Sequence, residues 1–249
     1  MLSEVLRNTE WREFGDFVSP AILKVMPASS AWRVANVLRR HRQDRTMRQT
    51  ATHERRALLE QAGIAVELDG VGDVRRVARD VAFTRPAERA RRVAELYFQQ
   101  LFQGDVTFLD LRTRTFSEHD GHLSWQPAPW MWRWDAAFIE PLRDIYRGFY
   151  GEDEALFQRG LEQLSLTPAQ AIFRKHFGGE QQRVTFHTRH FVSTFHDVFL
   201  CCRAHHITLS PSFLPLGLYL ATLYEHLERL GVEVDVRMAF QRVVRPRSN

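Results

Sequence analysis

The chain of 249 residues is poor in lysine and cysteine. Lys24 and Lys175 are its two lysines, so the basic residues are almost all arginine. The two cysteines, Cys201 and Cys202, are adjacent, and a disulfide between neighbouring residues is geometrically strained. The sequence therefore shows no sign of a disulfide-stabilised fold, and we expect reduced thiols, as in the cytoplasm.

Long apolar runs and common nucleotide motifs are absent as well. No stretch of about 18 apolar residues occurs, and the N-terminal MLSEVLRNTEWREF lacks the apolar centre of a signal peptide. We expect a cytoplasmic protein, and peripheral contact with the inner membrane stays open. Neither Gly-x-Gly-x-x-Gly nor Gly-x-Ser-x-Gly occurs, so dinucleotide-binding and hydrolase functions have no support.

The composition is that of a globular protein that can bury a core, with 44% hydrophobic and 26% charged residues. Apolar spacing predicts helices over residues 31–62 and 86–103, the second of which begins at Pro86. The middle of the first stretch, around Arg42 to Thr50, is too polar to assign. Gly63 is a typical helix stop. In the second half, the pattern predicts helices over residues 136–150, 152–164, 168–176, 189–205 and 212–230.

Strand signals are fewer and shorter. SPAILKVMP and GIAVELDGVGDV each predict a short strand, and DVTFLDLRTRTFSEHDGHLSWQ predicts two strands that form a hairpin around the turn HDG. The following PAPWMWRW has the proline content of a loop. The fold class is therefore α+β and mostly α.

Two segments have the composition of a contact surface. Residues 33–56 contain eight arginines, including Arg39, Arg40 and Arg42, against two acidic residues. This segment fits either a solvated helix face or a surface for an acidic protein or lipid partner, whereas no motif supports nucleic-acid binding.

The segment WMWRW contains Trp130, Trp132, Arg133 and Trp134, and tryptophan and arginine are favoured in protein interfaces. The three indoles either pack in the core or anchor a protein partner, and both alternatives stay open.

Histidine and cysteine gather in residues 176–206, whose role the sequence leaves undecided. Cys201 and His205 have the i, i+4 spacing of some zinc sites, but no second matched pair accompanies them, so we predict no metal site. In the same region the aromatic residues Phe186, Phe191, Phe195 and Phe199 recur at helical spacing. They indicate either core packing or an apolar groove.

Three stretches resemble UbiB/AarF-like atypical kinases over residues 90–236. FQQLFQGDVTFLDLRTRTF is similar to the stretch in which a helix runs into the family's catalytic loop, His-x-Asp-x-His-Pro-Gly-Asn. FIEPLRDIYRGFYGEDEALFQRGLEQLSL and ITLSPSFLPLGLYLATLYEHLERLGVEVDV resemble a later helix pair and the C-terminal signature. The resemblance implies a protein-kinase-like fold with a reduced N-terminal lobe at 1–82 and a helical C-terminal lobe at 83–249.

The catalytic motifs of that family are degenerate here. Asp110 matches the catalytic Asp, but Phe108 stands in place of the first His and Thr115 in place of the metal-binding Asn. The metal-binding Asp-x-Gly is replaced by LSWQPAP, and Asp135 is the next carboxylate. Because phosphoryl transfer depends on metal ions that neutralise charge, the resemblance implies a pseudokinase.

The resemblance also implies roles in the N-terminal part. Lys24 and Glu54 match the ion pair that holds the nucleotide in kinases. The predicted function is therefore a scaffold or regulatory partner near lipid or quinone metabolism, with no firm cofactor. A small sugar kinase of the lipopolysaccharide type, using ATP and Mg²⁺ with Lys24, Glu54 and Asp110, remains an alternative, as does a helical interaction module unrelated to kinases.

Overall fold

The computed structural model of the chain describes residues 28–68, 71, 85–119, 122–179, 181 and 183–244. Lys24 and the strand expected in SPAILKVMP lie outside the described residues. Within them the fold is α+β and mostly helical. The helices are α4 (Ala28–Gln43), α5 (Arg45–Ala62), α6 (Pro86–Phe102), α7 (Ala136–Gly151), α8 (Glu154–Gln163), α9 (Gln170–His176), α10 (Thr188–Ala204), α11 (Phe213–Leu230) and α12 (Val236–Val244).

The strands are short and form three small sheets. Parallel pairing joins β1 to β4, antiparallel pairing joins β4 to β3, and β2 with β5 and β6 with β7 form two separate antiparallel pairs. The strands are β1 (Val66–Leu68), β2 (Val106–Phe108), β3 (Phe116–His119), β4 (His122–Trp125), β5 (Met131–Arg133), β6 (Val184–Thr185) and β7 (Glu233–Val234). Single turns of 3-10 helix occur at Thr113–Thr115 and Thr167–Ala169.

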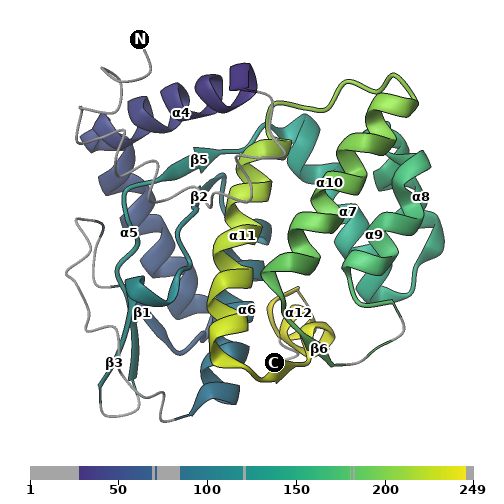
Figure 1. Ribbon diagram of the computed structural model, residues 1–249. Helices are drawn as coiled ribbons and strands as arrows, with labels where there is room; N and C mark the ends of the chain where they lie inside the picture. Colours follow the sequence, from purple (N-terminus) through teal and green to yellow (C-terminus); the bar gives the residue numbers. More distant parts are fainter. Residues whose placement is uncertain are drawn as a thin grey trace.

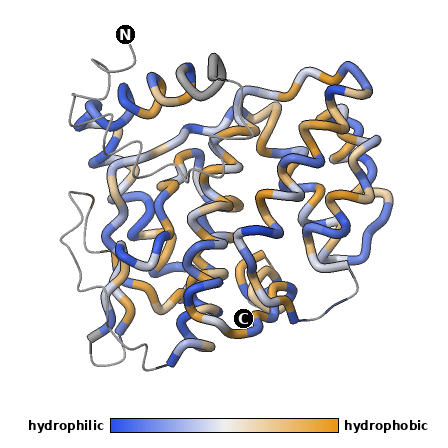
Figure 2. The backbone as a smooth tube through the Cα atoms, in the orientation of Figure 1, coloured by the Kyte–Doolittle hydropathy of each residue, from blue (hydrophilic) through white to orange (hydrophobic). Residues whose placement is uncertain are grey.

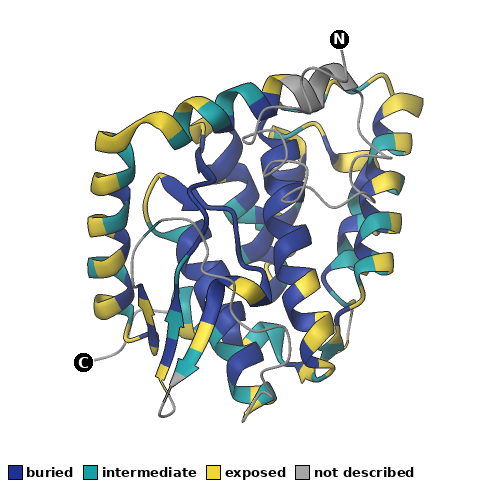
Figure 3. Ribbon diagram, turned by 60° about the vertical axis from the view of Figure 1, so that its left-hand side comes forward, coloured by how far each residue is buried: buried dark blue, intermediate teal, exposed yellow. Residues whose placement is uncertain are grey.

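Helices α6 and α11 form the centre of the molecule. Figure 1 shows α11 in the middle, with α4 and α5 to one side and α7 to α10 to the other. The apolar segments of the tube lie mostly toward this centre (Figure 2), and both central helices are largely buried (Figure 3). One hydrophobic core extends from Val34 on α4 to Phe240 on α12.

The five tyrosines of the chain all lie in this core, on α6, α7 and α11. Tyr97 stacks on Tyr219 with ring centroids 4.8 Å apart, and its hydroxyl lies 2.6 Å from that of Tyr146. Burial raises the pKa of every one of these phenols, so all are neutral in the folded chain. The cluster joins the central helices α6 and α11 to α7. The hydroxyls of Tyr97 and Tyr146 are hydrogen-bonded to each other, and that of Tyr219 is hydrogen-bonded to Gln100.

Two arginines from neighbouring helices cap the C-terminal end of α6. Buried Arg55 on α5 donates to the Gln99 side chain at 2.7 Å, the Gln103 carbonyl at 3.0 Å and the Val106 carbonyl at 2.7 Å. Arg143 on α7 donates to the Leu101 carbonyl at 2.8 Å. The carbonyls at a helix C-terminus lack partners within the helix and carry partial negative charge, so both guanidinium groups stabilise this end.

The sequence patterns located most helices correctly. Pro86 begins α6 as expected, Gly63 ends α5 in the left-handed region at φ 58°, and the predicted hairpin is formed by β3 and β4. The expected helix over 31–62 is two helices, because the Asp44 side chain accepts the Met47 N–H and starts α5 as a new helix.

The segment around WMWRW was predicted wrongly. The sequence predicted a loop there, but Met131–Arg133 is the strand β5, which pairs with β2. The first strand of the expected hairpin was also placed wrongly, because β2 pairs with β5 and the chain between β2 and β3 is irregular.

Helices α7 and α8 pack so closely that glycine is required between them. A Cβ atom on Gly148 would lie 2.3 Å from the Phe157 nitrogen, whereas a Cβ on Gly151, three residues on, would meet no atom within 4 Å. We expect Gly148→Ala to destabilise the fold by about 2–4 kcal/mol, because the two helices must separate.

The matched control is Gly151→Ala, which should leave stability unchanged or raise it slightly, since alanine is the better helix former. Urea unfolding of both variants measures the difference. Equal stability of the two variants would contradict the close packing.

Candidate functional site

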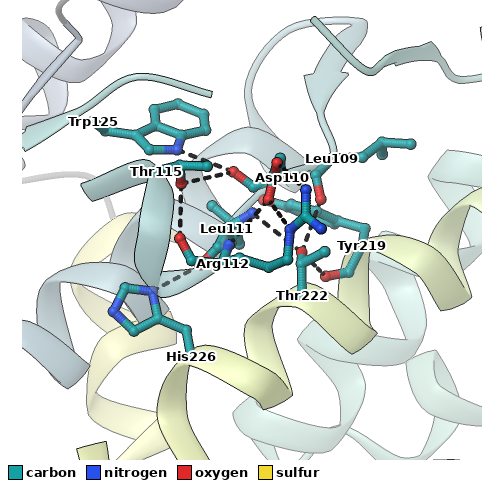
Figure 4. Close-up of polar contacts among 9 residues, drawn as sticks. All are labelled: Leu109, Asp110, Leu111, Arg112, Thr115, Trp125, Tyr219, Thr222 and His226. Carbon is teal, nitrogen blue, oxygen red and sulfur yellow. Dashed lines mark hydrogen bonds and ion pairs between the residues drawn. The ribbon is translucent and has the colours of Figure 1, made fainter. Parts of the chain in front are cut away.

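The residues that match the degenerate catalytic loop form an extended segment inside the protein. Leu109–Arg112 runs between β2 and the turn at Thr113–Thr115, with Asp110 and Leu111 both 0% exposed. Figure 4 shows this segment surrounded by side chains of α11 and by Trp125 of β4. Since it belongs to no helix or sheet, its backbone polar groups need other partners.

Helix α11 supplies two of these partners from one face. The Thr222 hydroxyl donates to the Leu109 carbonyl at 2.8 Å and accepts the Leu111 N–H at 3.2 Å. One turn later, His226 Nδ1 lies 2.7 Å from the Leu111 carbonyl. Thr222 and His226 are four residues apart, so they project from the same side of the helix.

Most of the remaining backbone groups of the segment are paired by its own neighbours. The Leu109 N–H donates to the Trp130 carbonyl at 2.8 Å, and the Trp125 indole N–H donates to the Asp110 carbonyl at 3.1 Å. The Thr115 hydroxyl donates to the Arg112 carbonyl at 2.8 Å. The segment is therefore fixed by hydrogen bonds on both sides, and its conformation is rigidly specified.

The preceding strand is held in a similar way by α6. The Gln100 side chain accepts the Phe108 N–H at 3.0 Å and donates to the Phe108 carbonyl at 3.3 Å, as a neighbouring strand would. The Thr107 hydroxyl donates to the Gln100 carbonyl at 3.2 Å. Helix α6 thus positions β2 directly before Asp110.

The Asp110 carboxylate is bound on both oxygens by Arg112. Arg112 Nε donates to Oδ1 at 2.7 Å and Nη2 donates to Oδ2 at 2.6 Å, while the Arg112 N–H also donates to Oδ1 at 3.2 Å. A bidentate guanidinium pair is the strongest geometry that a carboxylate finds in a protein. With no exposed surface and both oxygens engaged, Asp110 is placed neither to accept a substrate proton nor to contact a metal ion.

His226 is buried and neutral. Its Nδ1 donates to the Leu111 carbonyl, so Nε2 is the acceptor for the Arg89 Nε–H at 3.0 Å. Burial, and then the charge of Arg89, lower its pKa to about 3, although the hydrogen bond to Leu111 acts in the opposite direction. This histidine therefore orders the loop and does not exchange protons near neutral pH.

Two of the residues that the sequence placed in one catalytic site have opposite environments, with Asp110 buried and Glu54 exposed, and the third, Lys24, lies outside the described residues. Glu54 is exposed on α5, while the neighbouring Arg55 is the buried charge on that helix. Asp135 caps α7, since its side chain accepts the Ala137 N–H at 3.0 Å. No group of three metal-ligating side chains comes together in the part of the chain that the structure describes. The residues present therefore do not fit a magnesium-nucleotide site around Asp110.

The three tryptophans of WMWRW lie in the core. Trp130, Trp132 and Trp134 are between 3% and 8% exposed, and the Trp134 indole donates to the Thr107 hydroxyl at 2.7 Å. Of the two alternatives, core packing is the one that the structure shows, so these indoles offer no surface to a partner. Arg133 is exposed at the end of β5.

The arginines of the predicted basic segment are divided between α4 and α5, and Arg39, Arg40 and Arg42 lie on α4. Arg40 is exposed, Arg39 is half-buried, and the Arg42 guanidinium lies 5.1 Å from the ring centroid of Trp130. His41 Nδ1 lies 3.1 Å from the Met131 carbonyl and fixes α4 on β5. This helix remains the basic surface that the sequence predicted.

The histidine- and cysteine-rich region is built mostly by packing. Phe191 and Phe195 are buried between α10 and α11, and Cys201 and Cys202 are free thiols. His176 stacks on Tyr224 with ring centroids 5.7 Å apart, and burial lowers its pKa to about 4. At the N-terminus of α10, the Thr188 N–H donates to Glu228 of α11 at 3.2 Å. The aromatic stripe therefore fills the core.

The functional residues that sequence reasoning missed are Arg55, Thr222 and His226. A signal existed for the last two, since they are polar residues on the otherwise apolar stretch FLPLGLYLATLYEHL and share one helix face. Arg55 had no such signal, because it stands among five other basic residues between positions 42 and 56.

Comparisons with known proteins do not assign the chain to a family. No protein-family model matches the chain, and no curated protein matches it either. None of the described helices has the length and apolar character needed to cross a membrane. The fold and site define a mostly helical α+β protein with a buried loop at its centre that α11, Trp125 and Trp130 hold by hydrogen bonds.

We expect Asp110→Asn to lower the free energy of unfolding by about 3–5 kcal/mol, because it leaves the Arg112 charge buried without a counter-charge. A catalytic carboxylate that awaits a substrate would show the opposite behaviour, since its removal is commonly neutral or stabilising.

Urea unfolding measures this change. The double variant Asp110→Asn with Arg112→Met is the control, and it should recover part of the loss because the stranded charge is gone. A neutral effect of Asp110→Asn would contradict the structural role of the pair.

Stability should decrease as the pH falls below about 6.5, the ordinary pKa of histidine. The folded-state pKa of His226 is about 3, so in the intervening window the unfolded chain binds a proton that the folded chain does not. The free energy of unfolding then falls by up to about 1.4 kcal/mol per pH unit for this group.

Urea unfolding between neutral pH and about pH 4 measures the slope, to which His176 adds. The variant His226→Gln should have a shallower slope, whereas the exposed-site control His196→Asn should keep the original one. An unchanged slope in His226→Gln would show that this group does not carry the effect.

Proposed function

We propose that the protein is a non-catalytic, kinase-like protein that acts by binding a partner. The observation that carries this proposal is the engagement of both Asp110 oxygens by Arg112 in a fully buried segment. Phosphoryl transfer needs a carboxylate that reaches the substrate hydroxyl and ligands that hold metal ions at the phosphates. Asp110 has no open oxygen for the first task.

The order of the elements supports the kinase-like part of the proposal. A long helix, α6, leads into the segment with Asp110, the β3–β4 hairpin follows, and the helices α7 to α12 complete the chain. The resemblance over residues 90–236 implies this order. A helical module unrelated to kinases would have no reason to place a hairpin between residues 106 and 126, and β3 and β4 lie there.

The sugar-kinase alternative has less support. It requires Glu54 and Asp110 to face one cleft, but Glu54 is exposed on α5 and Asp110 is enclosed by Arg112, Trp125 and α11. If Arg112 rotated away, the buried Asp110 carboxylate would lose its counter-charge, which costs several kcal/mol. A conformation in which Asp110 is free to meet a substrate is therefore strongly disfavoured.

Scaffold and regulatory functions fit a rigid body of this kind. The loop that moves or opens in an active phosphotransferase is here part of the core and is bound to α6 and α11 on both sides. The protein therefore presents a fixed surface to a partner and contributes no chemistry of its own. A place beside lipid or quinone metabolism is part of the same proposal and rests on the resemblance alone.

Incubation with ATP and Mg²⁺ tests the proposal. We expect the melting temperature to stay within about 1 °C of the ligand-free value, because a ligand stabilises a fold only by binding it. We expect no transfer of radiolabelled γ-phosphate to the chain, to sugars or to water. Transfer that disappears in Asp110→Asn would overturn the non-catalytic function.

A further inference from the structure

Within the described residues, a group of arginines on α4 and at the start of α5 has no carboxylate as an ion-pair partner. We call Arg33, Arg39, Arg40 and Arg45 the α4 arginine face. Arg33, Arg40 and Arg45 are exposed, and Arg39 is half-buried. None of the four forms an ion pair with a carboxylate in the described part of the chain.

Much of the rest of the described surface is different, although Arg133, Arg183, Arg189 and Arg203 are likewise exposed and form no ion pair with a described carboxylate. From residue 85 onward, many arginines have a guanidinium nitrogen within 4.0 Å of a carboxylate oxygen. Arg147 and Arg159, for example, both pair with Asp144. The paired arginines are Arg85, Arg91, Arg92, Arg143, Arg147, Arg159, Arg174, Arg237 and Arg242. The α4 arginine face is therefore a local excess of positive charge.

The charged groups at the corner between the two helices are already engaged, whereas the exposed carboxylates Glu54 and Glu60 lie further along α5. Asp44 is the one acidic residue between positions 28 and 53, and its side chain accepts the Met47 N–H as a helix cap. Arg48 donates to the Arg42 carbonyl at 3.1 Å, and Arg42 lies over Trp130. These contacts hold the corner between α4 and α5 and leave the four arginines of the face available.

We propose that the α4 arginine face binds an acidic polypeptide, and that this surface is where the non-catalytic protein meets its partner. The inference rests on the proposed binding function and names the surface. Arg33 and Arg40 are two helical turns apart on one face, so their backbones lie about 10 Å from each other. A partner that presents carboxylates at that spacing, as on one face of an acidic helix, matches them with bidentate pairs.

An anionic membrane fits this surface less well than a protein does. Surface helices that enter a membrane expose apolar side chains beside their basic ones. The large hydrophobic residues that are exposed in the described chain, Leu200 and Met238, belong to α10 and α12. The inner residues of α4, Val34, Ala35 and Leu38, are buried in the core.

Single-stranded nucleic acid also fits less well. Proteins that bind it combine basic grooves with exposed aromatic rings on which bases stack. The aromatic rings that lie against α4, Trp130 and Trp132, are buried beneath it, so they offer no stacking surface. Carboxylates of a protein partner remain the ligand that the face fits best.

Fluorescence anisotropy with labelled poly-glutamate tests the inference on the full chain. We expect binding that weakens as salt rises toward about 0.15 M. We expect the double variant Arg33→Glu with Arg40→Glu to bind about tenfold or more weakly. The matched control is Arg189→Glu with Arg203→Glu, which makes the same change of net charge at exposed positions of α10 and should bind nearly as well as the original chain.

Three results would overturn the inference: no binding of poly-glutamate by the original chain, an equal loss in the two double variants, or tighter binding of duplex DNA or phosphatidylserine vesicles than of poly-glutamate. Melting curves of both double variants confirm that they are folded. Phosphate transfer from ATP would refute the non-catalytic function yet leave this surface in place, so the two failures are distinguishable.

Discussion

An extended stretch of chain that lies wholly inside a protein must pair its backbone polar groups, and this constraint shapes the centre of the molecule. From Val106 to Arg112 the partners come from α6, α11, β4 and β5. An unpaired buried N–H or carbonyl costs about 1–3 kcal/mol, so the segment is stable only while these elements stay in place. The two central helices, the hairpin and the buried tryptophans therefore depend on one another through this segment.

The same constraint explains why the Asp110 carboxylate is enclosed and engaged. In an active phosphotransferase the catalytic carboxylate must remain open to substrate, and its charge is compensated by metal ions and by the substrate itself. Here Arg112 supplies that compensation permanently, and Thr222 and His226 occupy the backbone groups beside it. An arrangement that specifies one conformation of the loop so completely is suited to stability, which agrees with a protein that functions by its surface.

The sequence predicted the elements that have local signals. Pro86 and Gly63 mark real helix ends, and the two strands predicted around HDG are paired as β3 and β4. The three-residue strand β5 was missed, because its tryptophans follow two prolines and its pairing with β2 is a long-range contact. The partner of Asp110 is Arg112, only two positions away in the sequence. Whether such a pair forms depends on the burial of both residues, and apolar periodicity does not indicate whether a loop is buried. Arg55 was not singled out, because charges on a helix are ordinarily solvated and only the fold brings the end of α6 against α5.

The cap that Arg55 provides joins the two parts of the chain. Its guanidinium has been removed from water, which lowers its pKa to about 10, and the groups that receive its hydrogen bonds belong to residues 99–106. Its hydrogen bonds therefore go to the Gln99 side chain and to carbonyl dipoles on a different segment, while the Glu54 carboxylate acts on it only through its charge. If the chain were cut between α5 and α6, one fragment would hold the Arg55 guanidinium without its acceptors. The other would hold the carbonyls at the end of α6 without their donor, so neither fragment is expected to keep its native structure alone.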